Sequence, residues 1–245
     1  MRKPSTAALR LENEDFVADE NILVAKNLTL KTLRGCPYSN INLAIKQGQV
    51  FAIQGENNSG KTSLLLTLAA RMKFSSGSLE ILNTSMPQRS GKIQQKVGLG
   101  IFKGLNDLPS AQRIDNTIAA ELELWGKHTQ QDDIEKMLDT WGIAELTHER
   151  IGDLTQEQLI YLGIRLAYIG SQKIIVIDDI ESDLTQTQSV SIMEQILKLS
   201  HTENISIIVG VLEKDLAQMA DNALYLNKHK QDMHETTSLA SQEVQ

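Results

Sequence analysis

Residues 55–62 have the types and spacing needed to bind a phosphate group. They are Gly-Glu-Asn-Asn-Ser-Gly-Lys-Thr and fit the pattern G-x-x-x-x-G-K-[ST]. The glycines let backbone N–H groups point into one concavity, and a following helix adds the positive end of its dipole. Lys61 can reach the β- and γ-phosphates, and the Thr62 hydroxyl can hold Mg²⁺. The residues expected to contact a nucleotide are Gly55, Asn57, Asn58, Ser59, Gly60, Lys61, Thr62 and Ser63.

The elements on either side of this loop are those that the motif requires. The short apolar run 50–53 precedes the loop and predicts a strand, and the apolar residues of 63–70 predict a helix after it. Because a phosphate loop joins a strand to the start of a helix, this context favours nucleotide binding over a chance glycine-rich turn.

A second group of candidate residues follows the apolar run Ile174–Ile177, which predicts a buried strand. Asp178 closes this run, and Asp179 comes directly after it. A phosphate loop needs an acid at the end of a neighbouring strand to hold Mg²⁺ through its waters. We expect Asp178 to hold the metal together with Thr62, and Asp179 to face the γ-phosphate. The alternative is an acid pair that merely ends a buried strand.

The order of the elements predicts an α/β fold with a mainly parallel sheet. Continuous apolar strands alternate with helices, and residues 114–168 are mostly helical by period. We expect a polar, loose leader over residues 1–20, one domain over 21–227, and a polar, disordered tail over 228–245.

Composition narrows the classes of function. The chain of 245 residues is 41% hydrophobic and 22% charged, as in ordinary globular proteins. Its net charge of −7 argues against nucleic-acid binding, which normally comes with a basic excess. The single cysteine, Cys36, excludes an internal disulfide and fits a reducing compartment. No apolar run approaches the ~20 residues of a spanning helix, so we expect a cytoplasmic protein that meets the membrane only through a partner.

With both motifs in this order, the chain resembles the ATP-binding-cassette (ABC) ATPases over about residues 22–226. Four further segments carry the resemblance, at 25–30, 46–50, 76–81 and 219–226. The resemblance implies a P-loop NTPase fold of ABC type. It also implies an N-terminal antiparallel β-subdomain and a helical subdomain inserted at about residues 104–168.

The same resemblance implies a function that depends on partners. Members of the family work as dimers of nucleotide-binding domains that clamp two ATP molecules head to tail, and most drive a membrane permease. It implies an ATPase that uses ATP and Mg²⁺, forms a homodimer or heterodimer, and contacts the inner face of the cell membrane through a permease subunit. The helical block would dock on that permease near residues 104–115.

Two departures from the family pattern fall on the side that would face a dimer partner. The signature segment, usually LSGGQ, is Leu-Thr-Gln-Glu-Gln at residues 154–158, so both glycines are gone and Glu157 lies where a phosphate would bind. Thr155 and Gln158 form a capping-box pattern, and the alternative is therefore a helix that caps itself. In the loop that crosses the dimer interface, Thr185 replaces an aspartate.

Other departures fall on the chain's own nucleotide site. Asp179 replaces the usual catalytic glutamate, which withdraws the carboxylate by about an ångström, and such a misplacement can cost ~100-fold in rate. The alternative is that Asp179 has a structural role or helps to hold the metal. Phe102 or Lys103 occupies the place of the metal-sensing glutamine. Lys103 is either a cation near the phosphates or a solvated loop lysine.

Two further family residues are missing from this site. Residues 211–213, Val-Leu-Glu, stand where the family has a histidine. The aromatic residue that stacks on adenine is absent, with Thr32 nearest to its place. Tyr38 is either a substitute for that aromatic residue or a packing residue.

The intact phosphate loop and the replaced family residues around it together predict the function. We expect an ATP-binding subunit of an ABC-type transporter that binds Mg-ATP and couples to a separate permease, with slow or impaired hydrolysis. Lys61 and the degenerate base Asp179 are the expected catalytic residues. The alternative is a non-hydrolysing, nucleotide-responsive module that regulates or scaffolds a membrane complex.

Overall fold

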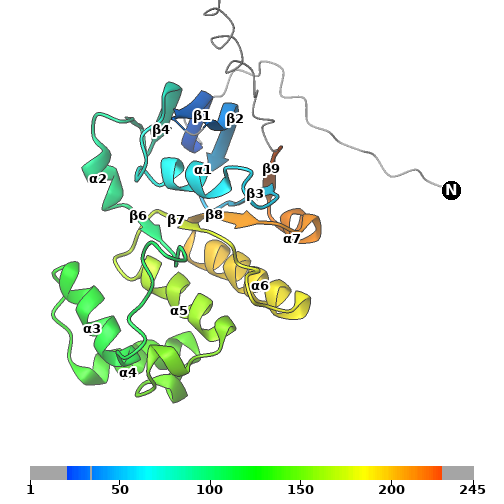
Figure 1. Ribbon diagram of the computed structural model, residues 1–245. Coiled ribbons are helices and arrows are strands. Elements are labelled where there is room, and N and C mark those ends of the chain that lie inside the picture. The colour runs from blue at the N-terminus through cyan, green and yellow to red at the C-terminus, as the bar shows by residue number, and fades with distance from the viewer. Residues whose placement is uncertain (1–20, 34, 228–245) are drawn as a thin grey trace, which may run out of the picture.

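The computed structural model describes residues 21–33 and 35–227 (Figure 1). The predicted leader, residues 1–20, and the predicted disordered tail, residues 228–245, lie outside the described residues. Within the described part, the strands form a four-stranded sheet and a five-stranded sheet. Among the helices of this part, none is long and apolar enough to cross a membrane.

The four-stranded sheet is antiparallel and has the order β2-β1-β4-β5. Its strands are β1 (Asn21–Thr32), β2 (Gly35–Lys46), β4 (Ser76–Ile81) and β5 (Thr84–Ser85). The inner face carries buried apolar residues such as Leu23, Leu43 and Leu79, so the sheet packs on one side only. This sheet confirms the predicted antiparallel β-subdomain.

The five-stranded sheet has the order β6-β7-β8-β3-β9, and its strands are parallel. Its strands are β3 (Val50–Gly55), β6 (Val97–Leu99), β7 (Ile174–Ile177), β8 (Ser206–Val211) and β9 (Asn222–Leu226). All residues of β7 and β8 are buried, as expected for central strands that are covered on both faces. In such sheets ligands bind outside the carboxyl ends of the strands.

The two faces of the parallel sheet are covered by different elements (Figure 1). Phe51 and Ile53 of β3 pack with α1 (Lys61–Leu68) and the antiparallel sheet. Val50 and Ala52 point the other way, because side chains alternate along a strand. They pack in a core with α5 (Gln156–Tyr168), α6 (Gln186–Glu203) and α7 (Lys214–Met219).

A helical block forms the lower part of the molecule in Figure 1. It contains α3 (Ile114–Leu124), α4 (Gln131–Trp141), two short 3₁₀ helices (Ala144–Leu146 and Ile151–Asp153) and α5. Ile118 of α3 and Leu138 of α4 share a core with Leu162 of α5, whereas Ile164 of α5 packs toward the parallel sheet. Helix α5 therefore joins the block to the sheet. The subdomain boundaries near residues 104 and 168 stay a prediction.

One helix was not predicted from the sequence. Helix α2 (Ser90–Gln94) precedes β6, and Ile93 is its only buried residue. Five residues with one apolar side chain give no helical period, so the pattern of the sequence could not reveal it.

Candidate nucleotide-binding site

The loop between β3 and α1 has a backbone that its sequence makes possible. Asn58 and Gly60 lie in the left-handed region, at φ 64° and 92°. Asparagine tolerates that conformation, and glycine adopts it freely. A Cβ on Gly60 would lie 2.1 Å from the Pro37 carbonyl oxygen, so a side chain has no room there. The strand β2 thus packs directly on the loop and fixes its shape.

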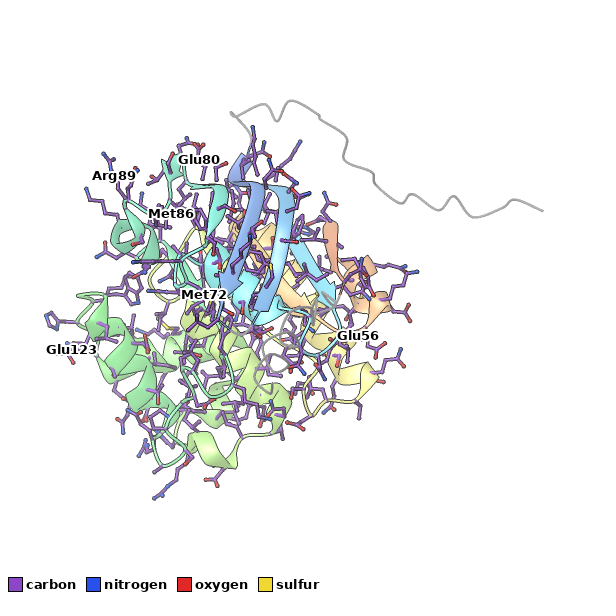
Figure 2. The ribbon with its side chains drawn as sticks, turned by 45° about the horizontal axis from the view of Figure 1, so that its top comes forward. Glu56, Met72, Glu80, Met86, Arg89 and Glu123 are labelled. Carbon is purple, nitrogen blue, oxygen red and sulfur yellow. The ribbon has the colours of Figure 1, made fainter. Side chains whose placement is uncertain are left out.

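The side chain of Lys61 lies inside this loop, and only 9% of the residue is exposed. Its ammonium donates to the Gly55 carbonyl and, at 3.4 Å, to the Glu56 carbonyl. Glu56 itself is exposed on the surface, on the opposite side of the molecule from Arg89 and Glu123 (Figure 2). The loop therefore wraps a cation, which is the charge that phosphate requires.

The N-terminus of α1 follows the loop, and no described side chain accepts hydrogen bonds from its first N–H groups. Its N-cap is Gly60, no described side chain caps it, and its first turn contains no acid. The hydroxyl of Ser59 is buried and has no hydrogen-bond partner in the described part of the chain. A helix start with open N–H groups is a ready anion-binding site.

Asp178 and Thr62 are brought together at the same end of the sheet. The Thr62 hydroxyl donates to the Asp178 carboxylate at 2.5 Å, although 116 positions separate the two residues. Burial raises the pKa of Asp178, and the Asp179 carboxylate raises it further against the lowering effects of Thr62 and Lys61. These two oxygen donors fit Mg²⁺, which is bound through one or two protein ligands together with phosphates and water.

Asp179 is exposed and has φ of 49°, in the left-handed region that Asp tolerates better than most residues. Two residues further on, the Glu181 carboxylate accepts hydrogen bonds from the backbone N–H groups of Leu212 and Glu213, the latter at 2.9 Å. Burial raises the pKa of Glu181, although these bonds oppose the rise. The loop after β7 is thereby tied to the end of β8. Sequence reasoning missed Glu181, because no local pattern links it to residues 31 and 32 positions away.

The helix that starts at the signature position caps itself, as its capping-box pattern predicts. The Thr155 hydroxyl accepts from the Gln158 backbone N–H at 3.2 Å, and the Gln158 side chain accepts from the Thr155 N–H at 3.0 Å. Glu157 lies in the first turn of this helix, α5. Thr185 and Gln188 form the same reciprocal pair at the start of α6. Each capping box therefore satisfies the N-cap and N3 backbone N–H groups of its helix from within the chain.

Of the two alternatives for Tyr38, the structure supports a packing residue. Tyr38 is only 1% exposed, and its hydroxyl donates to Thr67 at 2.7 Å. Thr67 donates in turn to the Ser63 carbonyl at 2.8 Å. The idea of Tyr38 as a substitute stacking residue is therefore wrong, because its ring is enclosed in the core. It instead braces α1 against β2.

The two candidates for the place of the metal-sensing glutamine lie in different environments in the segment after β6. Phe102 is 2% exposed and packs in the core, whereas Lys103 is exposed. Asn106 holds the turn through both ends of its amide, accepting from the Phe102 N–H at 2.7 Å and donating to the Gly100 carbonyl at 2.9 Å. Of the two, only Lys103 has its side chain in solvent.

These features define a class of protein, the α/β nucleotide-binding proteins with a P-loop. The loop joins a strand to a helix, and an acid from a second strand meets the threonine that follows the loop lysine. The family model described as ABC transporter matches residues 38–182, which is more than half of the chain. The chain therefore belongs to the ABC transporter family.

Curated relatives are similar to this chain at moderate identity. The methionine import ATP-binding protein MetN of Clostridium tetani is 25% identical over 193 residues, covering 76% of this chain and 60% of the relative. The phosphonates import ATP-binding protein PhnC of Lactiplantibacillus plantarum is 24% identical over 191 residues, covering 72% and 74%. The chain spans 53 to 61% of the length of the three MetN relatives from Clostridium tetani, Aliivibrio fischeri and Histophilus somni.

Solved structures of similar fold are ABC cassettes. The structure of cbiO1 from Clostridium perfringens, part of the transporter complex cbiONQ, has a TM-score of 0.74 at 23% identity and covers 85% of this chain and 86% of that one. The dimeric ATP-binding cassette MJ0796 bound to ADP and Pi has a TM-score of 0.71 at 22% identity and covers 87% and 97%. At these identities the likeness shows that the fold is shared.

Proposed function

We propose that this chain is the ATP-binding subunit of an ABC-type transporter, with slow hydrolysis of the bound ATP. The observation that carries the proposal is the contrast between two helix starts. Helix α1 begins beside a buried lysine and has no side-chain cap in the described structure. Helix α5 begins in a complete capping box with Glu157 in its first turn. The first start favours an anion, and the second does not.

The residues of the site then take the following roles. The loop N–H groups and the Lys61 ammonium bind the β- and γ-phosphates, with contacts from Asn57, Asn58, Ser59 and Ser63. Thr62 and Asp178 hold Mg²⁺, which neutralises phosphate charge when bound. Asp179 is the base that orients the attacking water, and its short side chain is one reason for slow turnover.

A second reason for slow turnover lies at the end of β8. Leu212 is 38% exposed at residues 211–213, the place of the missing histidine, and its backbone N–H is bonded to Glu181. A leucine side chain offers no donor to developing phosphate charge. This loss weakens the chain's own site, whereas the capped α5 weakens the site that the chain would complete on a dimer partner.

The proposed partners are a membrane permease subunit and a second nucleotide-binding domain, identical or different. The relatives MetN and PhnC are named import ATP-binding proteins, which supports a transporter role. Within residues 104–115 the side chain of Leu105 is 60% exposed, an apolar group suited to a permease contact. The chain would then sit in the cytoplasm at the inner face of the membrane.

Equilibrium binding of Mg-ATPγS tests the nucleotide site. We expect Lys61→Ala to weaken binding at least tenfold, because a charge-assisted contact to phosphate contributes about 1.5–3 kcal/mol. Lys136→Ala is the matched control, since this exposed lysine on α4 pairs with Asp133 at 3.7 Å and should leave binding unchanged. Equal affinity of the wild type and Lys61→Ala would contradict the proposal.

A non-hydrolysing regulatory or scaffold module is the second candidate function. The capping boxes of α5 and α6 favour it, because they satisfy two backbone N–H groups at each helix start on the proposed partner-facing side. Both candidates bind ATP, so binding alone does not separate them. Turnover that depends on Lys61 supports the transporter ATPase, and binding without such turnover supports the module.

A further inference from the structure

Basic side chains gather around α2 in a chain that is acidic overall. The net charge of the protein is −7, yet residues 71–106 contain six lysines and arginines and one acid, Glu80. Four of the six lie on or beside α2, and a further lysine just before β7 lies next to them. We call the following five residues the basic cluster, and all of them are exposed: Arg71, Arg89, Lys92, Lys96 and Lys173.

Helical spacing and one hydrogen bond bring four of these residues together. Arg89, Lys92 and Lys96 follow one another at spacings of three and four positions, so they lie along one side of the turn that α2 forms. The Arg71 guanidinium donates to the Gln94 carbonyl at 3.2 Å, which places Arg71 at the end of the same helix. The four charges therefore belong to one local surface around α2.

Two lysines of the basic cluster lie side by side at the amino ends of β6 and β7. Val97 pairs with Ile174 in the sheet, and the Lys173 N–H donates to the Lys96 carbonyl at 2.9 Å. Like charges on neighbouring strands repel each other. Within residues 21–33 and 35–227, no acid forms an ion pair with any member of the basic cluster. The fold therefore leaves this positive charge without compensation from its own acids.

The basic cluster and the proposed permease contact lie at the same edge of the parallel sheet. The edge strand is β6, and its three residues separate Lys96 from the turn that leads into residues 104–115. Three residues of strand span about 10 Å. Helices α2 and α3 lie on the same side of β6 in Figure 1. A permease that docks at residues 104–115 would therefore bring the basic cluster close to the surface of the bilayer.

The charge of the cluster fits an anionic membrane surface better than a nucleic acid. Anionic headgroups of the cytoplasmic leaflet strengthen binding about fivefold for each lysine or arginine near the surface. This attraction falls off within a Debye length of about 8 Å at physiological salt. A bilayer touches only one face of the protein, so salt screens its repulsion of the acids on the other faces.

We propose that the basic cluster binds the anionic lipid headgroups of the membrane beside the permease. This inference rests on the proposed transporter function and adds a direct lipid contact to it. Lysine and arginine donate charge-assisted hydrogen bonds to the headgroup phosphates. Contacts with the permease and with the lipids then reinforce each other, because either one holds the chain close to the other binding partner.

The test measures sedimentation of the full chain with two kinds of vesicle. One kind is phosphatidylcholine alone, and the other is an equimolar mixture with phosphatidylglycerol. Binding is expected only to the anionic vesicles at about 0.05 M salt, and about 0.5 M salt should abolish it by screening. The double variant Lys92→Gln with Lys96→Gln is expected to bind at least tenfold more weakly, since it loses two contacts of about fivefold each. The matched control, Lys136→Gln with Lys214→Gln, removes the same charge from exposed positions on α4 and α7 and should bind like the wild type.

The outcomes separate this inference from the function on which it rests. If the wild type binds no anionic vesicles, binds neutral vesicles equally well, or is weakened equally by both double variants, the basic cluster is not a lipid site. Affinity for Mg-ATPγS should be the same in both double variants and the wild type, because no cluster residue belongs to the nucleotide site. Loss of vesicle binding with Lys61-dependent nucleotide binding intact overturns only the lipid contact. A wild type that binds no nucleotide overturns the proposed function, and with it the reason to place the basic cluster beside a permease.

Discussion

At the scale of single residues, the site holds a buried ammonium and a half-buried carboxylate. Lys61 is buried and Asp178 is half-buried, and removing a charge from water is costly unless it is hydrogen-bonded. Loop carbonyls satisfy the ammonium, and the Thr62 hydroxyl satisfies the carboxylate. The raised pKa of Asp178 records the remaining cost, which a bound cation would relieve.

The Thr62–Asp178 contact was expected from the sequence, because the two motifs imply it. The Glu181 contacts to the end of β8 and the pairing of Lys103 with Asp183 were not. These contacts join loops that lie far apart in the chain and match no local pattern. Which carboxylate meets which backbone group is decided by the three-dimensional packing of the loops.

A buried carboxylate outside the site gives a pH-dependent prediction. Asp115 is 3% exposed, and its carboxylate accepts from the Arg113 guanidinium at 2.5 Å and from the Asn116 N–H at 2.8 Å. His148 lies 3.3 Å from the same carboxylate. Burial alone would raise the pKa of Asp115, but these partners outweigh it and hold the pKa below its usual range. The ionised form therefore stabilises the fold.

We expect Asp115→Asn to lower the free energy of unfolding by about 1–3 kcal/mol at pH 7. A lowered carboxyl pKa gives stability that is complete above the usual value near 4 and is lost as the pH falls through the folded value. The difference between Asp115→Asn and the wild type should thus shrink below about pH 4. Urea unfolding at several pH values measures it, with Asp139→Asn, an exposed acid of α4, as control. A difference that stays constant with pH would show that the charge of Asp115 is not the cause.

At the scale of elements, the starts of α1, α5 and α6 differ in how their backbone N–H groups are capped. Helix α1 leaves its N–H groups without a side-chain cap in the described structure, whereas α5 and α6 each begin in a threonine–glutamine capping box. The box at Thr155 was predictable, because its residue types at that spacing suffice. The uncapped start of α1 was implied by the glycine before it, since glycine offers no side-chain acceptor.

The cap of α5 gives a prediction for stability. We expect Thr155→Ala to lower the free energy of unfolding by about 1 kcal/mol, because it removes the acceptor for the Gln158 N–H. Affinity for Mg-ATPγS should stay the same, since this helix start does not bind the chain's own nucleotide. Urea unfolding and calorimetry measure the two quantities. Thr140→Ala is the control, because that hydroxyl bonds the Lys136 carbonyl within α4. Unchanged stability, or a loss of nucleotide affinity, would contradict this role of the cap.

At the scale of the whole molecule, the nucleotide loop lies where three parts meet. The loop ends β3, packs against β2 of the antiparallel sheet, and faces the acid that ends β7. The α/β class was predictable, because buried parallel strands are continuous apolar runs. The strand order was not, since β8 lies between β3 and β7 although it follows both in the chain. Only tertiary packing brings Asp178 across that strand to Thr62.

For the whole molecule we propose an intact ATP site with slow turnover. Asp179 is shorter than the usual base, Leu212 supplies no donor, and α5 is already capped. In the proposed function, each of these features slows hydrolysis and leaves the phosphate loop in place. Binding and turnover should therefore be separable in this protein.

Steady-state ATP hydrolysis at saturating Mg-ATP, with Lys61→Ala as the blank, tests this claim most directly. Typical enzymes turn over at about 10 s⁻¹, and a misplaced base costs ~100-fold, so we expect Lys61-dependent turnover of about 0.1 s⁻¹ or lower in a chain that binds Mg-ATPγS. Lys61-dependent turnover of several per second would show that Asp179 and the capped α5 do not limit the site, and would contradict the claim.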